Sequence, residues 1–334
     1  MRGESVMAFE GERRGPGKRA RSFTVRVPAS TSNLGAGFDC FGLALRLYLS
    51  VRATIVAAAD EPCRVRNSGE GAGLSRTADN LIYVAMRHAA SREGLELPPV
   101  RLAVHNELPL GRGLGSSAAA IVAGLSLCSL VCGRELSGET VLRYALELEG
   151  HADNVAPALY GGFVVNCVTS DGDVLAVKRR WPADLKAIVV SPDVPLKTAE
   201  ARDALPRMVE RASAVHNIQR AALFVAALDA GRYDLLWEAM RDRLHQRHRE
   251  FLVPGLSAAL STPREPGLVG LALSGAGPSV FALATARFAE LGETIAESFR
   301  RNGTGAKVRV LDVDDEGIQT SSQDNPNGAQ RKRG

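Results

Sequence analysis

One glycine-rich segment constrains the fold of this chain more than any other feature. LPLGRGLGSSAAA, residues 108–120, follows a strand-like stretch and opens into a strongly apolar one that ends at Cys132. Glycines at positions 111, 113 and 115 carry no Cβ, so backbone N–H groups there can approach an anion closely. A helix that begins behind them adds the partial positive charge of its N-terminus. The segment therefore predicts a triphosphate-binding loop made of Leu108, Pro109, Leu110, Gly111, Arg112, Gly113, Leu114, Gly115, Ser116, Ser117 and Ala118.

The spacing of this segment argues against two other kinds of nucleotide loop. No Lys-Ser or Lys-Thr pair follows the glycines, as a Walker A loop requires. The GxGxG spacing also departs from the dinucleotide fingerprint, and the acidic residue about twenty positions further on, Glu135, does not end a strand. The plain alternative is a glycine turn that only leads into a buried helix.

Strands and helices are interleaved in the first half of the chain. Residues 23–27 alternate like a strand, and the turn residues of the following PASTSNLGAGFD predict a long, shaped loop. Periodicity predicts strands at 45–56 and 100–107 and helices at 80–93 and 137–149, the latter with Ser137 as N-cap. Ser-Asp-Gly-Asp at 170–173 predicts a hairpin turn between two strands.

The second half of the chain repeats this mixture of elements. Strands are predicted at 185–191, 268–273 and 306–313, and helices near 199–211, 213–229, 233–243 and 286–301. The pattern is that of an α+β protein with two lobes. We therefore expect a disordered basic tail at 1–21, an ATP-binding N-terminal domain at 22–183, a C-terminal domain at 184–314 and a disordered polar tail at 315–334.

The positive charge of the chain is concentrated in its first residues. The formal net charge is +4, of which residues 1–21 carry +3 and residues 315–334 carry none. The body of the chain is thus nearly neutral, and aromatic residues make up only 5% of the sequence. Nucleic-acid binding needs a basic groove with stacking platforms, so we expect no nucleic-acid partner.

Cysteine usage and apolar runs predict a cytoplasmic protein. The five cysteines are odd in number and irregularly spaced, which argues against a disulfide framework. Cys128 and Cys132 have the spacing of two core thiols on one helix face rather than of a metal site. The longest apolar stretch, 118–132, falls short of the ~20 residues that span a bilayer, and the first residues lack the apolar run of a signal peptide. We therefore expect no membrane partner.

Three separated motifs resemble those of the GHMP kinase superfamily. They are VPASTSNLGAGFDCFGLAL at 27–45, PLGRGLGSSAA at 109–119 and LSGAGPSVFAL at 273–283. The second is shared by the whole superfamily. The first, together with EGHADNVAPALYGG at 149–162, is most similar to the homoserine-phosphorylating branch. The resemblance covers residues 23–313.

The resemblance implies both a fold and a reaction. The N-terminal lobe would be like ribosomal protein S5 domain 2 and the C-terminal lobe ferredoxin-like, with the active site in the cleft between them. The reaction would use ATP and Mg²⁺ to phosphorylate the side-chain hydroxyl of L-homoserine, a step toward threonine, and homodimers are usual in this branch. One alternative is another GHMP kinase of the mevalonate-pathway or shikimate type, and a second is an inactive regulator. The complete phosphate loop argues against the regulator.

Matched positions supply groups for both charges of a zwitterionic amino acid. By resemblance, Asn33 and Asp39 reach the substrate, and Asp39 pairs with its ammonium group. Arg202 and Arg249 match arginines that bind the carboxylate, which suits their planar fork. Thr198 is a weaker candidate beside Arg202, since it has an alternative role as the N-cap of the next helix.

His151 and Asn154 match residues beside the reacting hydroxyl, and with Arg202 they form the expected catalytic set. A neutral amide such as that of Asn154 cannot accept the proton, so catalysis is expected to rest on positioning and charge stabilisation. Asp153, the neighbour of Asn154, is the alternative base.

Magnesium is expected to bind a hydroxyl and a carboxylate. Ser117 supplies the hydroxyl, and Glu147 is preferred for the carboxylate over Glu149. Only one of these two glutamates can point inward, because residues two apart on a helix face nearly opposite directions. Gly275 and Gly277 of the third motif are expected to shape a loop that packs against the phosphate loop.

Overall fold

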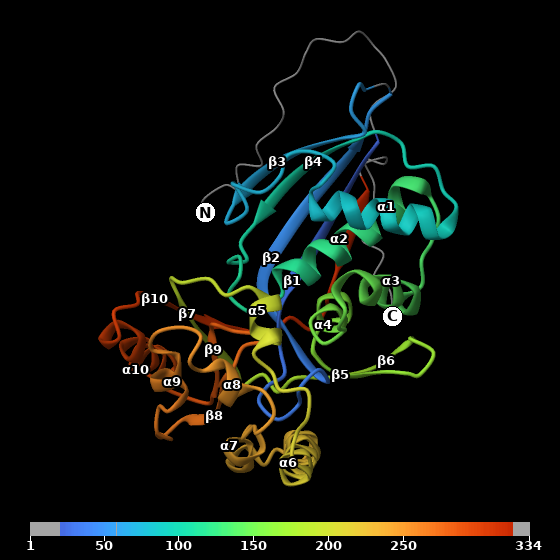
Figure 1. Ribbon diagram of the computed structural model, residues 1–334. Coiled ribbons are helices and arrows are strands. Elements are labelled where there is room, and N and C mark those ends of the chain that lie inside the picture. Colours follow the sequence, from blue (N-terminus) through green and yellow to red (C-terminus); the bar gives the residue numbers. More distant parts are fainter. Residues whose placement is uncertain (1–20, 58, 323–334) are drawn as a thin grey trace.

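The computed structural model describes residues 21–57 and 59–322, which form two antiparallel-rich sheets with helices packed on them (Figure 1). Strand order in the first sheet is β11-β1-β2-β4-β3, with β5 pairing to β2 and β6 to β5. Its strands are β1 (Ser22–Ser32), β2 (Phe41–Ile55), β3 (Cys63–Gly69), β4 (Val100–Asn106), β5 (Phe163–Val168), β6 (Val174–Arg179) and β11 (Gln319–Ser322). The second sheet has the order β10-β7-β9-β8, with β7 (Lys186–Pro192), β8 (Leu268–Leu273), β9 (Val280–Ala284) and β10 (Ala306–Leu311).

Helices of the N-terminal half cover one face of the first sheet. They are α1 (Leu81–Glu93), α2 (Ser116–Cys132), α3 (Gly138–Glu149) and α4 (Val155–Tyr160). Those of the second half are α5 (Thr198–Asp203), α6 (Arg211–Asp229), the 3₁₀ turn η1 (Tyr233–Leu235), α7 (Leu236–Ala239), α8 (Gln246–Arg249), α9 (Leu256–Leu260) and α10 (Phe288–Arg301). None of the helices described combines the length and the apolar character needed to cross a membrane. The chain passes from the first sheet to the second between β6 and β7.

Several local predictions are confirmed. The side chain of Ser137 accepts a hydrogen bond from the N–H of Thr140, as an N-cap does. Strands β5 and β6 pair around the turn predicted at 170–173. Of the five thiols, Cys63 and Cys128 are buried, whereas Cys167 is exposed on β5.

Two predicted helices are shorter than their apolar spacing suggested. The helix predicted at 199–211 ends at Asp203, ahead of Pro206, which disfavours helical geometry in the residue before it. The helix predicted at 233–243 ends at Ala239. Asp242 accepts hydrogen bonds from the backbone N–H groups of Leu244, His245 and Gln246, and this turns the chain toward α8.

The prediction that PASTSNLGAGFD is entirely loop was wrong at its start. Strand β1 continues to Ser32, and only 33–40 form the loop before β2. Residues 29–32 pair with β2 beyond a β-bulge between Pro28 and Ala29. The small polar residues Ser30, Thr31 and Ser32 are buried, and backbone pairing and the contacts of their hydroxyl groups keep them in the sheet.

The prediction that residues 315–334 are disordered was wrong for their first part. Strand β11 pairs with β1 along Phe23–Arg26. The buried carboxylate of Asp314 accepts hydrogen bonds from the N–H groups of Glu316 and Gly317 and from the hydroxyl of Tyr48 at 2.8–3.0 Å. This anchor returns the chain to the first sheet. Residues 323–334, like residues 1–20 of the predicted basic tail, lie outside the described residues.

A cluster of aromatic rings joins α6 to the first sheet below the 33–40 loop. The ring of Phe224 lies 5.5 Å from those of Phe41 and Phe163, which are 5.2 Å from each other. All three are buried. Because Phe41 directly follows the loop, this packing fixes where the loop ends.

Replacing Phe224 by alanine is expected to lower the free energy of unfolding by about 3–5 kcal/mol, because the cavity cannot close between two anchored rings. Ile218→Ala is the matched control on the same helix, since Ile218 is exposed and its loss is expected to cost less than about 0.5 kcal/mol. Urea denaturation of both variants measures the difference. Equal costs would contradict the assignment of Phe224 to this core.

Candidate active site

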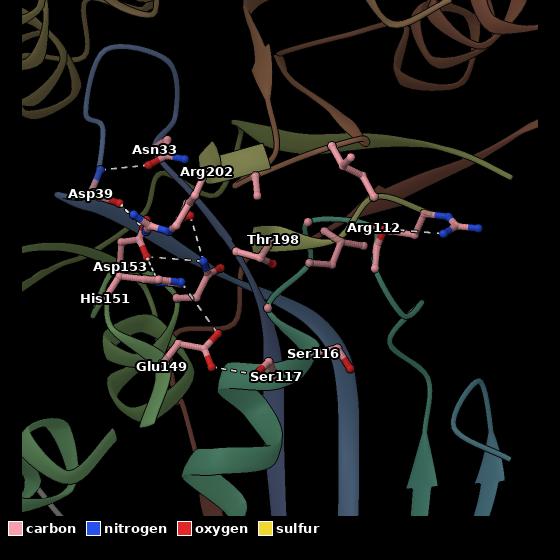
Figure 2. Close-up of a pocket in the computed structure, with 18 of the residues that line it drawn as sticks. Asn33, Asp39, Arg112, Ser116, Ser117, Glu149, His151, Asp153, Thr198 and Arg202 are labelled. Carbon is pink, nitrogen blue, oxygen red and sulfur yellow. Dashed lines mark hydrogen bonds and ion pairs between the residues drawn. The ribbon is translucent and has the colours of Figure 1, made fainter. Parts of the chain in front are cut away.

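Most of the predicted site residues converge on one pocket between the two lobes (Figure 2). It is lined by Ser32, Asn33, Phe38, Asp39, Pro109, residues 111–117, Glu149, His151, Asp153, Asn154, Leu196, Thr198, Arg202, Arg249 and Ala276. Figure 2 shows Asp39, Arg202, His151 and Asp153 gathered on one side, and Ser116 and Ser117 at the start of α2. The pocket therefore combines a helix N-terminus with a charged cluster.

The carbonyl groups of the glycine loop are tied back to the protein. The carbonyl of Gly111 accepts from the N–H of Leu196 at 3.0 Å, and that of Leu114 accepts from the N–H of Ser30 at 3.3 Å. The hydroxyl of Ser274 donates to the carbonyl of Gly113 at 2.6 Å. With these acceptors occupied, the N–H groups of the loop and of the first turn of α2 are the ones left to bind an anion.

Close packing around the loop requires glycine at two positions. A Cβ on Gly113, which has φ +71°, would lie 2.1 Å from the carbonyl oxygen of Ser274 and about 3.0 Å from that of Gly277. A Cβ on Gly115, at φ +64°, would lie 2.1 Å from the hydroxyl of Ser30. The third motif thus packs against the phosphate loop, as predicted.

Three members of the predicted phosphate loop do not line the pocket. Leu108 and Ala118 are fully buried in the core, and Leu110 lies outside the pocket. The side chain of Asn106 bonds both the N–H and the carbonyl of Leu108, so neither group is directed at a ligand. The apolar side chains of Leu108 and Ala118 anchor the loop to the core instead.

Arg112 lies on the far side of the loop from Asp39 and Arg202 (Figure 2). Its guanidinium donates to the carbonyl oxygens of Leu110 and Asp193, and burial lowers its pKa. These contacts hold a fixed cation at this edge of the pocket.

Of the two glutamates weighed for magnesium, Glu149 faces the pocket and the preferred Glu147 does not. The hydroxyl of Ser117 donates to Glu149 Oε2 at 2.6 Å, and both residues line the pocket. Glu147 instead pairs with His88 at 2.8 Å and Arg92 at 3.2 Å, outside the pocket. As predicted, the two glutamates point to different faces of α3. The one that points into the pocket is Glu149, the last residue of the helix before its Gly150 C-cap.

Two residues predicted to bind opposite ends of a zwitterion are paired with each other. Arg202 Nη2 lies 2.9 Å from Asp39 Oδ1, and both side chains are more than one-third exposed. Asn33 holds the loop in place, because its Oδ1 accepts from the N–H of Asp39 and its Nδ2 donates to the carbonyl of Gly275, each at 2.9 Å. Each amide end of Asn33 keeps one further hydrogen-bonding position.

Arg249 is a buried cation at the base of the pocket, with only 1% of its surface exposed. Its Nε donates to the carbonyl of Ala201 at 2.9 Å, and its guanidinium lies 5.5 Å from the centre of the Phe38 ring. Burial lowers its pKa to about 10, and the positive charge of Arg202 adds to this effect. Both arginines therefore face the same small volume.

Asn154 is held by hydrogen bonds at both ends of its amide. Its Oδ1 accepts from the hydroxyl of Ser30 at 3.0 Å, and its Nδ2 donates to the hydroxyl of Ser32 at 2.9 Å. Thr198 is the first residue of α5 and faces the pocket. The N-cap of α5 is Lys197, so the alternative role of Thr198 as N-cap is excluded.

His151 and Asp153 form a buried pair beside Asn154. His151 Nδ1 lies 2.8 Å from Asp153 Oδ1, whereas His151 Nε2 is 3.9 Å from Glu149 Oε1. Burial opposes both charges, yet the shared hydrogen bond raises the pKa of His151 and lowers the pKa of Asp153. A carboxylate with a lowered pKa is a poor proton acceptor, which argues against Asp153 as the base.

Replacing His151 by a neutral residue is expected to lower the free energy of unfolding by an amount that depends on pH. Because the pKa of His151 is raised in the folded state, protonated His151 stabilises the fold fully below pH 6.5, its ordinary pKa, and this stabilisation is lost as the pH rises through the folded-state pKa. The stabilisation by ionised Asp153 is present above pH 3.8, its ordinary pKa, and is lost as the pH falls through its lowered folded-state pKa. His151→Asn keeps a donor near Nδ1, so its cost should be on the order of 1 kcal/mol larger near pH 5.5 than near pH 8.5. Urea denaturation at both pH values measures this, and an equal cost would contradict it.

Several pocket residues were not predicted from the sequence. Ser32, Phe38, Leu196 and Ala276 line the pocket, and Ser30 holds Asn154 from behind. A signal existed for the serines, since residues 30 and 32 lie on the same face once β1 is known to include them. Phe38, Leu196 and Ala276 lie in loops, and their residue types alone do not indicate a binding site.

Comparison with known protein families gives two matches in separate parts of the chain. The GHMP kinases N terminal domain matches residues 80–162, and the GHMP kinases C terminal domain matches residues 224–308. A homoserine kinase of Deinococcus radiodurans is 45% identical over 297 residues, covering 88% of this chain and 95% of the relative. A homoserine kinase of Desulfitobacterium hafniense is 42% identical over 294 residues, covering 88% and 98%.

Solved structures show the same fold. The crystal structure of a homoserine kinase from Cytophaga hutchinsonii has a TM-score of 0.80 and 29% identity, covering 92% of this chain and 100% of that one. A mevalonate diphosphate decarboxylase from Staphylococcus aureus has a TM-score of 0.64 at 16% identity, covering 90% and 98%. The second likeness concerns the fold alone.

Proposed function

This chain belongs to the homoserine kinases of the GHMP kinase family, whose reaction is the ATP-dependent phosphorylation of homoserine, and we propose that it performs this reaction in the pocket described above. The observation that carries the proposal is the juxtaposition of two features. Free N–H groups at the start of α2 face the same pocket as Asp39, Arg202 and Arg249. The first feature suits a triphosphate and the second a zwitterion.

The ion pair between Asp39 and Arg202 separates when the substrate binds. Exposed ion pairs contribute only about 0–1 kcal/mol, so separating this one costs little. The ammonium group of homoserine takes Asp39, while its carboxylate takes Arg202 and the buried Arg249. One weak pair is thereby exchanged for charge-assisted bonds at both ends of the substrate.

The reacting hydroxyl is positioned beside Asn154 and His151. Asn154 is fixed by Ser30 and Ser32, and His151 is fixed by Asp153, so neither has to reorganise when the substrate arrives. His151 adds positive charge next to the transferring phosphoryl group. A loose transition state places little demand on a protein base, and none of these groups has to remove the proton in advance.

Ser117 and Glu149 would hold the magnesium ion of magnesium-ATP. Their oxygens are hard ligands, and 2.6 Å between them leaves both directed to one point at the start of α2. The described residues hold no group of three or more His, Cys, Asp or Glu able to bind a metal, which fits an ion that takes its other ligands from phosphate and water. When bound, the ion neutralises the charge of the phosphate oxygens.

A substrate panel tests the proposed function. Product formation from homoserine, mevalonate, shikimate and galactose is measured with magnesium-ATP, and homoserine is expected to be turned over far better than the other three. Turnover of another alcohol well above homoserine would assign the chain to a different branch. No binding of magnesium-ATP in a calorimeter would support an inactive regulator.

Arg202→Ala is expected to raise the KM for homoserine about tenfold to a hundredfold, because a charge-assisted bond to the carboxylate is lost. The KM for ATP should stay within about twofold, since Arg202 is placed at the amino-acid end. Steady-state kinetics with each substrate varied in turn distinguishes the two effects. A rise confined to the KM for ATP would show that the ends of the pocket are reversed.

We also propose that the chain works as a homodimer in the cytoplasm. Support comes from its membership of a family in which homodimers are usual and from its use of ATP. Light scattering of the purified protein measures the mass, and a monomer at micromolar concentration would reject the dimer.

A further inference from the structure

His245 is completely buried between the two charged halves of the amino-acid pocket, with no surface exposed. Its Nε2 lies 2.9 Å from the carbonyl oxygen of Gly35, in the loop that carries Asp39. Its Nδ1 lies 3.2 Å from Arg249 Nη1. One imidazole ring thus links the residue proposed to bind the carboxylate to the loop proposed to bind the ammonium group.

The chemistry of these two neighbours fixes the protonation of the ring. A carbonyl oxygen only accepts hydrogen bonds, so the proton must be on Nε2. A guanidinium only donates, so Nδ1 must carry a lone pair. The ring is therefore neutral, in agreement with the lowering of the pKa of His245 by burial.

Other contacts prevent the ring from turning away. Phe38 stacks on it with centroids 5.0 Å apart and planes 19° apart. Asp242 accepts from the N–H of His245 at 2.9 Å and from Asn217 Nδ2 at 2.7 Å. Asn217 Nδ2 also donates to the carbonyl of Ala36 at 3.1 Å, next to Gly35. The ring and the loop are consequently held by one connected set of hydrogen bonds.

Arg249 depends on this acceptor for its orientation. Its Nε and Nη1 donate to Ala201, His245 and, at 3.5 Å, to Gly275, whereas Nη2 donates to none of the described residues. The acceptor at His245 Nδ1 therefore sets the rotation of the guanidinium that leaves Nη2 for the pocket.

We propose that His245 is a positioning residue that fixes the separation between Arg249 and the Asp39 loop, so that both ends of the amino-acid substrate are met at once. The proposal rests on the function assigned to this pocket above. It attributes affinity for the substrate to a residue that does not itself touch it.

Two substitutions separate the two hydrogen bonds of the ring. His245→Gln places an amide near the position of Nε2, so it keeps a donor to Gly35 but loses the acceptor for Arg249. His245→Asn places an amide near Nδ1, so it keeps the acceptor but loses the reach to Gly35. His248→Gln, three residues along the same chain segment and outside the pocket, is the matched control.

Both His245 variants are expected to raise the KM for homoserine about tenfold and to leave the KM for ATP within about twofold, because one hydrogen bond that positions a charged group is lost in each. His248→Gln should match the wild type. In spectra that correlate ring ¹⁵N nuclei with carbon-bound protons, one histidine of the wild type, absent from the His245→Asn spectrum, should show the neutral form protonated on Nε2.

The outcomes distinguish this proposal from the one beneath it. A wild-type protein that does not phosphorylate homoserine would reject the function of the pocket. A wild type that does, together with folded His245 variants whose KM for homoserine is unchanged, would reject the positioning role alone. Equal rises in both KM values would also reject it, since they indicate a general structural defect. If neither variant folds, the wild-type ¹⁵N spectrum decides, with the His245 signal identified by its nuclear Overhauser contacts to the stacked Phe38 ring, and a ring protonated on Nδ1 would overturn the proposal.

Discussion

Gly113→Ala is expected to lower kcat/KM for ATP at least about a hundredfold, because the backbone donors of the phosphate loop lose their alignment. The added Cβ would lie 2.1 Å from the carbonyl oxygen of Ser274, a distance that backbone atoms cannot tolerate. The loop must then move away from the third motif. Its N–H groups move with it, so magnesium-ATP binding measured by calorimetry should weaken together with turnover.

Gly133→Ala provides the matched control at the other end of the same helix. Gly133 has nearly the same dihedral, φ +67° against +71°, but a Cβ there meets no atom within 4 Å. Both substitutions carry the strain of a left-handed alanine, and only Gly113→Ala adds a collision. Similar nucleotide affinity in the two variants would mean that the phosphates are bound elsewhere.

Glu149→Gln is expected to reduce kcat at least about a hundredfold, because a neutral amide is a much weaker partner than a carboxylate for a divalent cation beside phosphates. The hydroxyl of Ser117 should lose its charged acceptor at the same time. Raising the magnesium concentration should restore part of the activity. Initial rates over a range of magnesium concentrations measure both effects.

Glu147→Gln makes the same chemical change two residues earlier on α3. It removes only the contacts with His88 and Arg92, and exposed ion pairs of this kind contribute about 0–1 kcal/mol. Kinetics close to those of the wild type are therefore expected. If Glu147→Gln were the damaging substitution, the assignment of the carboxylate would return to Glu147.

The sequence located the chemistry of this protein better than it located the elements that carry it. Glycines at 111, 113 and 115 predict a phosphate loop because their conformational freedom is a property of each residue. The loop carbonyls that turn the N–H groups outward are instead held by Leu196, Ser30 and Ser274, which are remote in sequence. Such contacts, within the N-terminal lobe for Ser30 and between the lobes for Leu196 and Ser274, arise only in the folded chain.

The prediction of the magnesium ligand was limited because the sequence does not show which face of α3 points toward the pocket. Spacing alone shows that Glu147 and Glu149 point apart, but it does not say which face of α3 meets the pocket. The answer depends on how α2 and α3 pack, which places Ser117 against Glu149. His245 was missed for a similar reason, since its contact with the carbonyl of Gly35 joins two segments that are remote in sequence.

Backbone pairing explains the two wrong predictions, one at the C-terminal end of β1 and one at β11. The side chains of PASTS and QTSS have little strand propensity, so their composition suggests turns or disorder. In the fold, residues 29–32 find a partner in β2 and Gln319–Ser322 find one in β1. A ready partner strand outweighs weak local propensity.

A crystal structure of the protein with homoserine, magnesium and a non-hydrolysable ATP analogue tests the central claim most directly. The account predicts the analogue's phosphates within hydrogen-bonding distance of the N–H groups of residues 113–117, with the homoserine ammonium on Asp39 and its carboxylate on Arg202 and Arg249. Phosphates bound anywhere other than at the start of α2 would contradict it.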